Sequence, residues 1–391
     1  MMHVYKYLIL FIICLYFQTN TPQTFVKVLI EKTTHNQIEP MTWLFESLEE
    51  FTIRLPQKTE KAVKKNFKKL KITVIKNKIY LDGKYYRFNS IKLVPGKAPI
   101  SVNKDLYDGN FIICRDPKTN AHVFMINQVE IEDYICSVLK TESWPGWPIE
   151  VNKAFAIASR SYVLAQVLIA RKSKLQYHIK NTNHHQTYSG IHNEQDIKLA
   201  VQETKSIILG HNNEPILAMF DSCCGGVIPA HIEGFDFIKY PYLERKERCN
   251  YCKKIKMYSW KASFSHNDFK KTIQEKTPGL KKIKKIVTNT DKAGTVKNLV
   301  VHGHSDQEIY KIDARSMYSL FKKIKSFCYS VNHKSNRIII DGYGFGHHLG
   351  LCQWGAREMI RKGYTYKDIL RFYYPGAKFM KFKDNKEDKV A

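Results

Sequence analysis

Acidic side chains are scarce in this chain of 391 residues. There are 36 Asp and Glu against 63 Lys and Arg, which gives a net charge of +27. An excess of this size concerns the partners of a protein and not its fold. It points to a polyanion, and three classes qualify: nucleic acid, an anionic membrane, and an acidic polymer such as a cell wall.

Long hydrophobic runs are also missing. The apolar stretch at residues 7–17, YLILFIICLYF, is too short to span a bilayer comfortably. It fits the apolar part of a secretory signal, so residues 1–20 are predicted to be a signal peptide or, since no small-x-small cleavage site follows, an N-terminal anchor. A buried N-terminal strand is the alternative. Export predicts a periplasmic, cell-wall-associated or membrane-anchored protein, and it argues against nucleic acid as a partner.

Cysteine is too sparse for a disulfide scaffold, with nine residues scattered over the chain. Four of them lie near one another in sequence, as Cys223-Cys224 and Cys249-x-x-Cys252. The second pair has the spacing with which two thiolates bind one Zn²⁺, and a cysteine of the first pair would complete the site. Disulfides compete with metal binding in an exported protein, and free thiols are the third alternative. The sequence leaves all three open.

A nucleotide-binding loop is missing as well. Residues 342–355, GYGFGHHLGLCQWG, follow a predicted strand at 337–341, but their glycine spacing is not G-x-G-x-x-G and no Gly-Lys-Ser/Thr follows. Such glycines let the backbone approach a bulky ligand closely. With His347, Gln353 and Trp354 beside them, they predict a carbohydrate-binding wall, because an indole stacks on sugar rings while polar side chains bond hydroxyl groups.

The most informative stretch that is present surrounds Glu142. An apolar segment begins at Tyr134, breaks at a loop that starts with Glu142, and continues from Pro148 as a helix that is apolar nearly all round and therefore predicted to be buried. The loop holds Trp147 and also Trp144, which is predicted to contact substrate. A carboxyl group beside indole rings is poorly solvated, which favours its protonated form and suits a general acid. The alternative is a surface glutamate with two structural tryptophans.

Three histidines follow in the polar loop at residues 177–190. His178, His184 and His185 lie within eight residues and could ligate a metal ion, or they could be polar loop residues near an active site. In the same loop, Gln186 and Tyr188 are predicted to contact substrate.

The fold class predicted from these patterns is α+β or mixed α/β, with sheet-rich lobes around one buried helix and a substrate cleft between the lobes. Residues 21–104 are predicted as a strand-rich and basic region, 105–380 as the catalytic domain, and 381–391 as a charged tail. Short alternating runs predict strands, and Asp82-Gly83 predicts a hairpin turn. Predicted strands lie at 25–31, 78–81, 85–88, 110–114, 122–126, 206–209, 216–220, 296–301 and 337–341.

Three segments together resemble the stage II sporulation protein D family, which includes the amidase-enhancer proteins. They are residues 142–162, residues 221–226 (DSCCGG) with 241–243 and 258–260 after them, and residues 344–376. The similarity extends over residues 106–379. It implies an exported, cell-wall-directed protein of mixed α/β fold. Members shown to be enzymes are lytic transglycosylases acting on peptidoglycan glycan strands, and the family's catalytic glutamate falls on Glu142.

This implication agrees with the chemistry of the residues. Hydrolysis of glycosides commonly uses two carboxylates, but the only other one near Glu142 in sequence is Glu150, which helical spacing pairs with Lys153. A lytic transglycosylase needs one acid and no cofactor, because the 6-hydroxyl of the substrate attacks C1. Lys153 and Arg160 would bind the glycan or influence Glu142, and structural ion pairing is the alternative for both.

The second function that the resemblance implies is non-catalytic. A wall-binding protein of this type would stimulate a partner N-acetylmuramoyl-L-alanine amidase. Some family members also bind zinc through a Cys…His-Cys-Gln loop, where this chain has His178…His184-His185-Gln186. Either histidine has replaced the thiolate ligand or this metal site is lost. The family usually has His-Gly where this chain has His347-His348, so the packing there is expected to differ.

Overall fold

The computed structural model describes residues 24–34, 38–55, 65–119, 121–143, 146–183, 185–305, 307–334 and 337–382. The predicted signal or anchor segment at 1–20 lies outside these residues, as do residues 383–391 of the predicted tail. Two predicted site residues, Trp144 and His184, also lie outside them.

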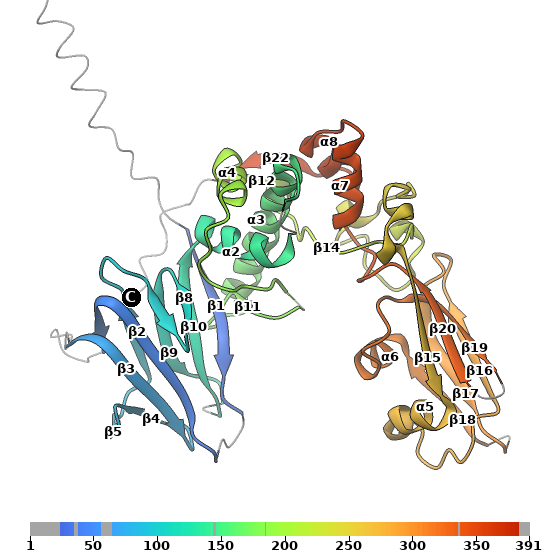
Figure 1. The fold of residues 1–391 in the computed structure, drawn as a ribbon, viewed down its shortest axis with the longest axis horizontal. Coiled ribbons are helices and arrows are strands. Elements are labelled where there is room, and N and C mark those ends of the chain that lie inside the picture. Colours follow the sequence, from blue (N-terminus) through green and yellow to red (C-terminus); the bar gives the residue numbers. More distant parts are fainter. Residues whose placement is uncertain are drawn as a thin grey trace, which may run out of the picture.

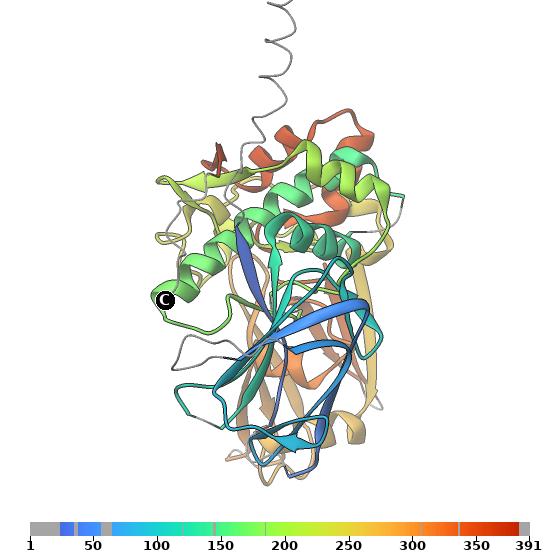
Figure 2. The same cartoon turned by 90° about the vertical axis from the view of Figure 1, so that its left-hand side faces the viewer.

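The protein is a mixed α+β structure in which two sheet-rich lobes extend from a layer of helices. Figure 1 shows the N-terminal strands on the left, strands β15 to β20 on the right, and helices α2, α3, α4, α7 and α8 above and between them. In the view of Figure 2 the same helices again lie above the strands. The predicted sheet-rich lobes and helical centre are therefore present, whereas the predicted substrate cleft between the lobes stays a prediction.

One large sheet makes the first lobe. Its order is β11-β1-β10-β9-β6-β2-β3-β4-β5, with β7 pairing β2 and β8 pairing β7. The predicted boundary at 104 falls in the turn between β7 and β8, which pair with each other, so it does not separate two sheets. The strands are β1 (Phe25–Lys32), β2 (Met41–Arg54), β3 (Lys65–Ile75), β4 (Lys78–Leu81), β5 (Lys84–Tyr85), β6 (Ser90–Val94), β7 (Ile100–Val102), β8 (Asp105–Tyr107), β9 (Asn110–Arg115), β10 (Val123–Glu130) and β11 (Ile179–Lys180).

Two helices lie next to this sheet. α2 (Ile131–Glu142) follows β10 directly, and α3 (Ile149–Lys172) begins after Pro148. α3 is long and apolar enough to cross a membrane. However, 78% of its most apolar 18-residue stretch is buried inside the protein. It is the core helix that the all-round apolar pattern predicted.

The second lobe contains two small sheets, ordered β15-β20-β19 and β16-β17-β18. A separate hydrophobic core that includes Phe269, Leu299 and Ile340 fills this lobe. Its elements are β15 (Ser259–Ser265), α5 (His266–Ile273), β16 (Lys285–Thr290), β17 (Val296–His302), β18 (Ile309–Asp313), α6 (Ala314–Leu320), β19 (Cys328–His333) and β20 (Arg337–Tyr343).

The remaining elements connect the lobes to the helical layer. A parallel pair joins β14 to β21, and β12 lies between β13 and β22. Two helices, α7 and α8, lie near the C-terminal end, and Thr365 caps the second one with a complete capping box. These elements are α4 (Gln195–Glu203), β12 (Ile207–His211), β13 (Glu214–Pro215), β14 (Phe220–Asp221), β21 (Leu351–Cys352), α7 (Gln353–Arg361), α8 (Tyr366–Tyr373) and β22 (Lys378–Lys381).

Candidate active site and cysteine cluster

Glu142 is the last residue of α2 rather than part of the loop, and it is half-buried. The backbone N–H of Thr187 donates to its Oε1 atom over 3.0 Å. The side-chain amide of Gln353 donates to the Glu142 carbonyl oxygen over 2.9 Å. Three segments that are far apart in sequence therefore meet at this residue: the end of α2, the histidine-containing loop and the start of α7.

The aromatic neighbours of this site pack on one another. Trp147 is 6% exposed, and its ring meets that of Trp354 edge-on with 5.2 Å between the centroids. The guanidinium group of Arg357 lies 5.2 Å from the Trp354 centroid and 6.0 Å from that of Trp147. Trp147 is thus a structural tryptophan. The ring of the half-buried Trp354 forms a cation–π contact with Arg357.

Gln186 and Tyr188 lie beneath the surface. Gln186 is 1% exposed and accepts a hydrogen bond of 2.9 Å from the hydroxyl of Tyr134, while Tyr188 is 3% exposed and donates one of 2.6 Å to the side chain of Asn127. The Tyr134 and Tyr188 rings stack with 5.4 Å between centroids, and burial raises the pKa of both phenols well above the usual value. Their burial speaks against the predicted contact with substrate. Gln186 and Tyr188 instead stabilise the loop whose backbone donates to Glu142.

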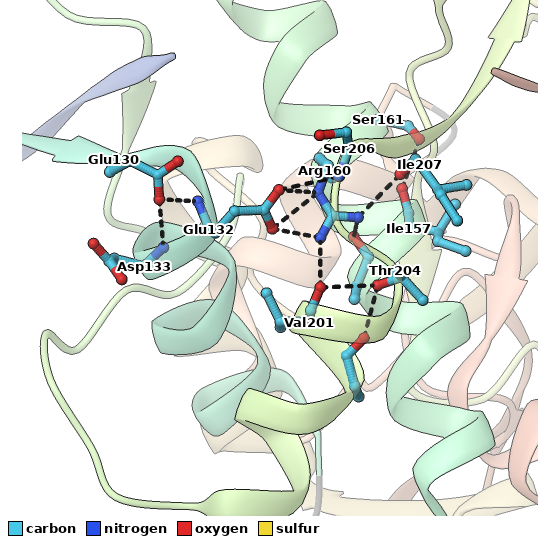
Figure 3. A network of polar contacts seen from close by, with 12 residues as sticks. Glu130, Glu132, Asp133, Ile157, Arg160, Ser161, Val201, Thr204, Ser206 and Ile207 are labelled. Carbon is cyan, nitrogen blue, oxygen red and sulfur yellow. Dashed lines mark hydrogen bonds and ion pairs between the residues drawn. The ribbon is translucent and has the colours of Figure 1, made fainter. Parts of the chain in front are cut away.

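Lys153 and Arg160 are held in ion pairs. Lys153 Nζ lies 2.7 Å from carboxylate oxygens of both Glu150 and Glu203, and hydrogen bonds from these two groups raise the pKa of Lys153. Arg160 is 1% exposed and forms a two-point ion pair with Glu132, with 2.6 Å between Nη2 and Oε2. Figure 3 shows that the guanidinium also meets the backbone near Ile207, to whose carbonyl Nη1 donates over 3.0 Å. Both residues therefore form structural ion pairs, which was the alternative to binding the glycan. Arg160 is too deeply buried to contact substrate.

The glycine-rich turn packs against the chain itself. A Cβ atom on Gly346 would lie 2.3 Å from the Cβ of Asp221, and one on Gly344 would lie 2.8 Å from the Cys223 carbonyl oxygen. The close approach that these glycines permit is therefore toward residues 221–225 and not toward a ligand. The prediction that these glycines let the backbone approach a carbohydrate is therefore wrong.

The two histidines of the turn differ in their surroundings. His347 is half-buried, and its Nδ1 accepts from the N–H of Leu349 over 3.1 Å. His348 is 1% exposed and has a φ of +68°, a conformation that favours glycine. Burial lowers the pKa of each to about 4, so both rings are neutral at pH 7. A side chain thus occupies a left-handed position at His348, and the expected difference in packing from the family stays a prediction.

His348 connects three segments. The Phe327 N–H donates to its Nε2 over 3.3 Å, so the ring proton is on Nδ1 and is donated to the Cys224 carbonyl oxygen over 3.0 Å. Its backbone N–H donates to Asp221 Oδ2 over 2.7 Å. Asp221 is 6% exposed, and burial raises the pKa of its carboxyl well above the usual value. Sequence reasoning missed Asp221, for which the only signal was its place in the DSCCGG motif.

Four cysteines gather at one point. The Sγ atoms of Cys224, Cys249, Cys252 and Cys352 all lie within 4.8 Å of one another, and all four residues are buried. All eight cysteines in the described part of the chain have free thiols, so the disulfide alternative is not observed there. The predicted pair Cys249 and Cys252 is part of this cluster, and Cys224 rather than Cys223 completes its upstream side. Cys352, which sequence reasoning missed, is the fourth member.

The histidine loop shows no corresponding cluster among its described residues. His178 uses Nδ1 to accept the backbone N–H of Lys27 over 3.1 Å, and burial lowers the pKa of His178 to about 3. His185 is half-buried, and its backbone N–H donates to the Thr182 carbonyl oxygen over 2.9 Å. Metal binding by His184 and His185 stays a prediction.

Comparison with known proteins assigns the family. A family model described as Stage II sporulation protein matches residues 119–211, which include Glu142 and all of α3. An uncharacterized protein of Brachyspira hyodysenteriae is 31% identical over 273 residues, covering 68% of this chain and 72% of that protein. Stage II sporulation protein D of Bacillus subtilis is 26% identical over 269 residues, covering 64% and 75%. The amidase enhancer of Bacillus subtilis is 24% identical over 286 residues, covering 61% of this chain but only 39% of that protein. The chain belongs to the stage II sporulation protein D family.

Proposed function

We propose that this protein is an exported cell-wall enzyme that cleaves peptidoglycan glycan strands by lytic transglycosylation, with Glu142 as general acid and base. The observation that supports this most directly is the placement of Glu142. Its side chain is half-buried at the end of a helix. The backbone N–H of Thr187 donates to its carboxyl group, and the side-chain amide of Gln353 donates to its backbone carbonyl. A carboxyl group fixed in this way is oriented before substrate binds, as acid–base catalysis requires.

The proposed reaction has two proton transfers at one group. Glu142 donates its proton to the oxygen of the scissile glycosidic bond, and the bond from that oxygen to C1 breaks. The 6-hydroxyl oxygen of the same sugar then bonds C1, and its proton passes to Glu142. The product is a 1,6-anhydro sugar, and Glu142 is protonated again without water or a second carboxylate.

Two opposing electrostatic influences act on the carboxyl group of Glu142. Glu142 lies at the C-terminal end of α2, where the helix dipole opposes negative charge. The Thr187 N–H, which donates to its carboxyl oxygen, stabilises the charged form instead. These two influences on the carboxyl group oppose each other.

The test uses purified protein and glycan strands from which the stem peptides have been removed. We expect 1,6-anhydro products by mass spectrometry, and we expect Glu142→Gln to lower their rate of formation by at least about 100-fold. Glu150→Gln is the matched control, because Glu150 is a half-buried glutamate that pairs with Lys153. It should retain activity. A Glu142→Gln variant that is folded and fully active would disprove the assignment.

A second function is favoured by the amidase enhancer among the relatives. On this alternative the chain binds glycan strands without cleaving them and stimulates an N-acetylmuramoyl-L-alanine amidase. A folded protein that sediments with glycan strands, yields no anhydro product and raises the rate of a partner amidase would favour it over the enzymatic function.

A further inference from the structure

We propose that Cys224, Cys249, Cys252 and Cys352 bind one structural Zn²⁺ ion in a site of four thiolates. The proposal rests on the positions of the four sulfur atoms, their burial and the hydrogen bonds around them. It holds whether or not the protein is a lytic enzyme, because no step of the proposed reaction uses the metal.

The distances between the sulfur atoms match a tetrahedral zinc site. Cys224 Sγ lies 3.7 Å from Cys252 Sγ, Cys249 Sγ lies 3.9 Å from Cys252 Sγ, and no pair among the four exceeds 4.8 Å. Zn–S bonds of about 2.3 Å in a tetrahedron place the sulfur atoms about 3.8 Å apart. A disulfide would require about 2.05 Å. The four thiols are therefore arranged around a common centre and not as two bonded pairs.

The cluster lies in the interior, where an ion would be shielded from water. The exposed fractions are 1% for Cys224 and Cys249 and 0% for Cys252 and Cys352. Buried thiolates need compensation of their charge. A Zn²⁺ ion offsets half of the four negative charges. Four cysteines leave no coordination position open, as is typical of structural rather than catalytic zinc.

Hydrogen-bond donors surround two of the sulfur atoms. The backbone N–H groups of Cys224 and Gly355 each donate to Cys352 Sγ over 3.3 Å, and the Tyr373 hydroxyl lies 3.2 Å from Cys249 Sγ. Position 355 has no room for a larger residue, since a Cβ atom there would lie 2.1 Å from the Tyr373 oxygen and 3.1 Å from both of these sulfur atoms. Such outer contacts orient the ligands of a metal site.

The proposed ion joins three segments of the chain. Cys224 follows β14, Cys249 and Cys252 flank the start of a short 3₁₀ helix, and Cys352 ends β21 and caps α7. The residues directly after Cys352 also reach the active site. Gln353 donates to the Glu142 carbonyl, and the Trp354 N–H donates to the Ser222 carbonyl oxygen over 3.1 Å. The metal would thus fix the start of α7 relative to the other two segments.

The first experiment measures metal in the full chain purified under reducing conditions from cells supplied with zinc. We expect one equivalent of zinc by mass spectrometry of the metal. Replacement by Co²⁺ should produce the strong sulfur-to-cobalt charge-transfer absorption of a tetrahedral thiolate site. Less than a tenth of an equivalent of zinc, with four thiols that are free or joined as disulfides, would overturn the proposal without bearing on lytic activity.

The second experiment tests which residues are ligands. Cys352→Ser and Cys224→Ser should lose most of the bound zinc, while Cys328→Ser, a change of a free cysteine outside the cluster, should retain it. Cys223→Ser distinguishes the two adjacent cysteines and should also retain zinc. If Cys223→Ser loses the metal and Cys224→Ser keeps it, the ligand set is wrong. Removal of zinc from the unmodified protein by a chelator should lower its thermal midpoint, a readout that does not depend on any variant.

Discussion

At the scale of single residues, the ion pair between Arg160 and Glu132 is the contact whose loss should matter most for stability. The Arg160 side chain is 1% exposed and that of Glu132 15%. Glu132→Ala would leave a buried guanidinium without its carboxylate, and we expect the free energy of unfolding to fall by about 3–5 kcal/mol. Urea denaturation of the purified variant measures this change.

The exposed pair of Lys69 and Glu46 is the control for this prediction. Its two atoms lie 2.9 Å apart, but the side chains are 67% and 41% exposed. Water screens such a pair, so Glu46→Ala should change the free energy of unfolding by less than about 1 kcal/mol. Equal losses in the two variants would show that burial of Arg160 does not determine the effect.

What the sequence could predict of the site depended on local spacing. The pair of Glu150 and Lys153 follows from helical geometry, since residues three apart share a face. No such rule connects Arg160 to Glu132, which is 28 residues earlier, or Cys352 to Cys252. Those contacts arise only when the chain folds back on itself. Ion pairing of Arg160 was one of two alternatives, but its partner Glu132 and the fourth cysteine were not predicted.

At the scale of elements, the residue types at helix ends agree with the structure, and most predicted strands are present. Gly363 follows α7 with a φ of +88°, and Thr365 caps α8, both as their residue types indicate. The strand β3 was missed because its sequence is rich in lysine. Lys68, Lys69 and Lys71 are exposed while Leu70 and Ile72 are fully buried, so this lysine-rich segment contributes one side of a strand to the core.

The hydrogen bond between β1 and His178, the residue before β11, should make the stability of the protein depend on pH. His178 must be neutral to accept the Lys27 N–H, and burial together with the nearby charges of Lys27 and Arg171 lowers the pKa of His178 to about 3. In the unfolded chain it is about 6.5. Between these values the unfolded state binds more protons than the folded state, so stability falls as the pH is lowered from about 6.5 toward 3.

The variant His178→Gln isolates this contribution, because glutamine can accept the same hydrogen bond but does not titrate. Chemical denaturation at several pH values between 7 and 4 should show a shallower loss of stability for the variant than for the unmodified protein. Parallel curves would mean that His178 is not responsible.

At the scale of the whole molecule, the net charge of +27 should control binding to cell walls. Attraction between exposed charges is screened within about 8 Å at physiological salt and within about 3 Å at 1 M. We expect the fraction of protein that sediments with purified sacculi to fall steeply as salt is added. Sacculi stripped of their anionic polymers are the control and should bind less protein at low salt. Sedimentation that does not respond to salt would contradict an electrostatic origin.

The general architecture could be predicted, but the division of the chain could not. An apolar helix and short alternating runs indicate a mixed fold, and both are present. The sequence offered no sign that the strands β1 to β10 pair in one sheet, because register between distant strands depends on tertiary contacts. The second lobe was likewise predicted only as isolated strands.

The cysteine cluster also has a topological consequence. The second lobe departs after Cys252 and returns before Cys352, and the sulfur atoms of these two residues lie within 4.8 Å of each other. The lobe is therefore an insertion whose two ends meet at one point of the parent fold. The proposed metal site holds the two ends of the lobe together whatever the length of chain between them. Lengthening or shortening the hairpins far from Cys252 and Cys352 would therefore cost little conformational entropy and would leave Glu142 and the helices around it in place.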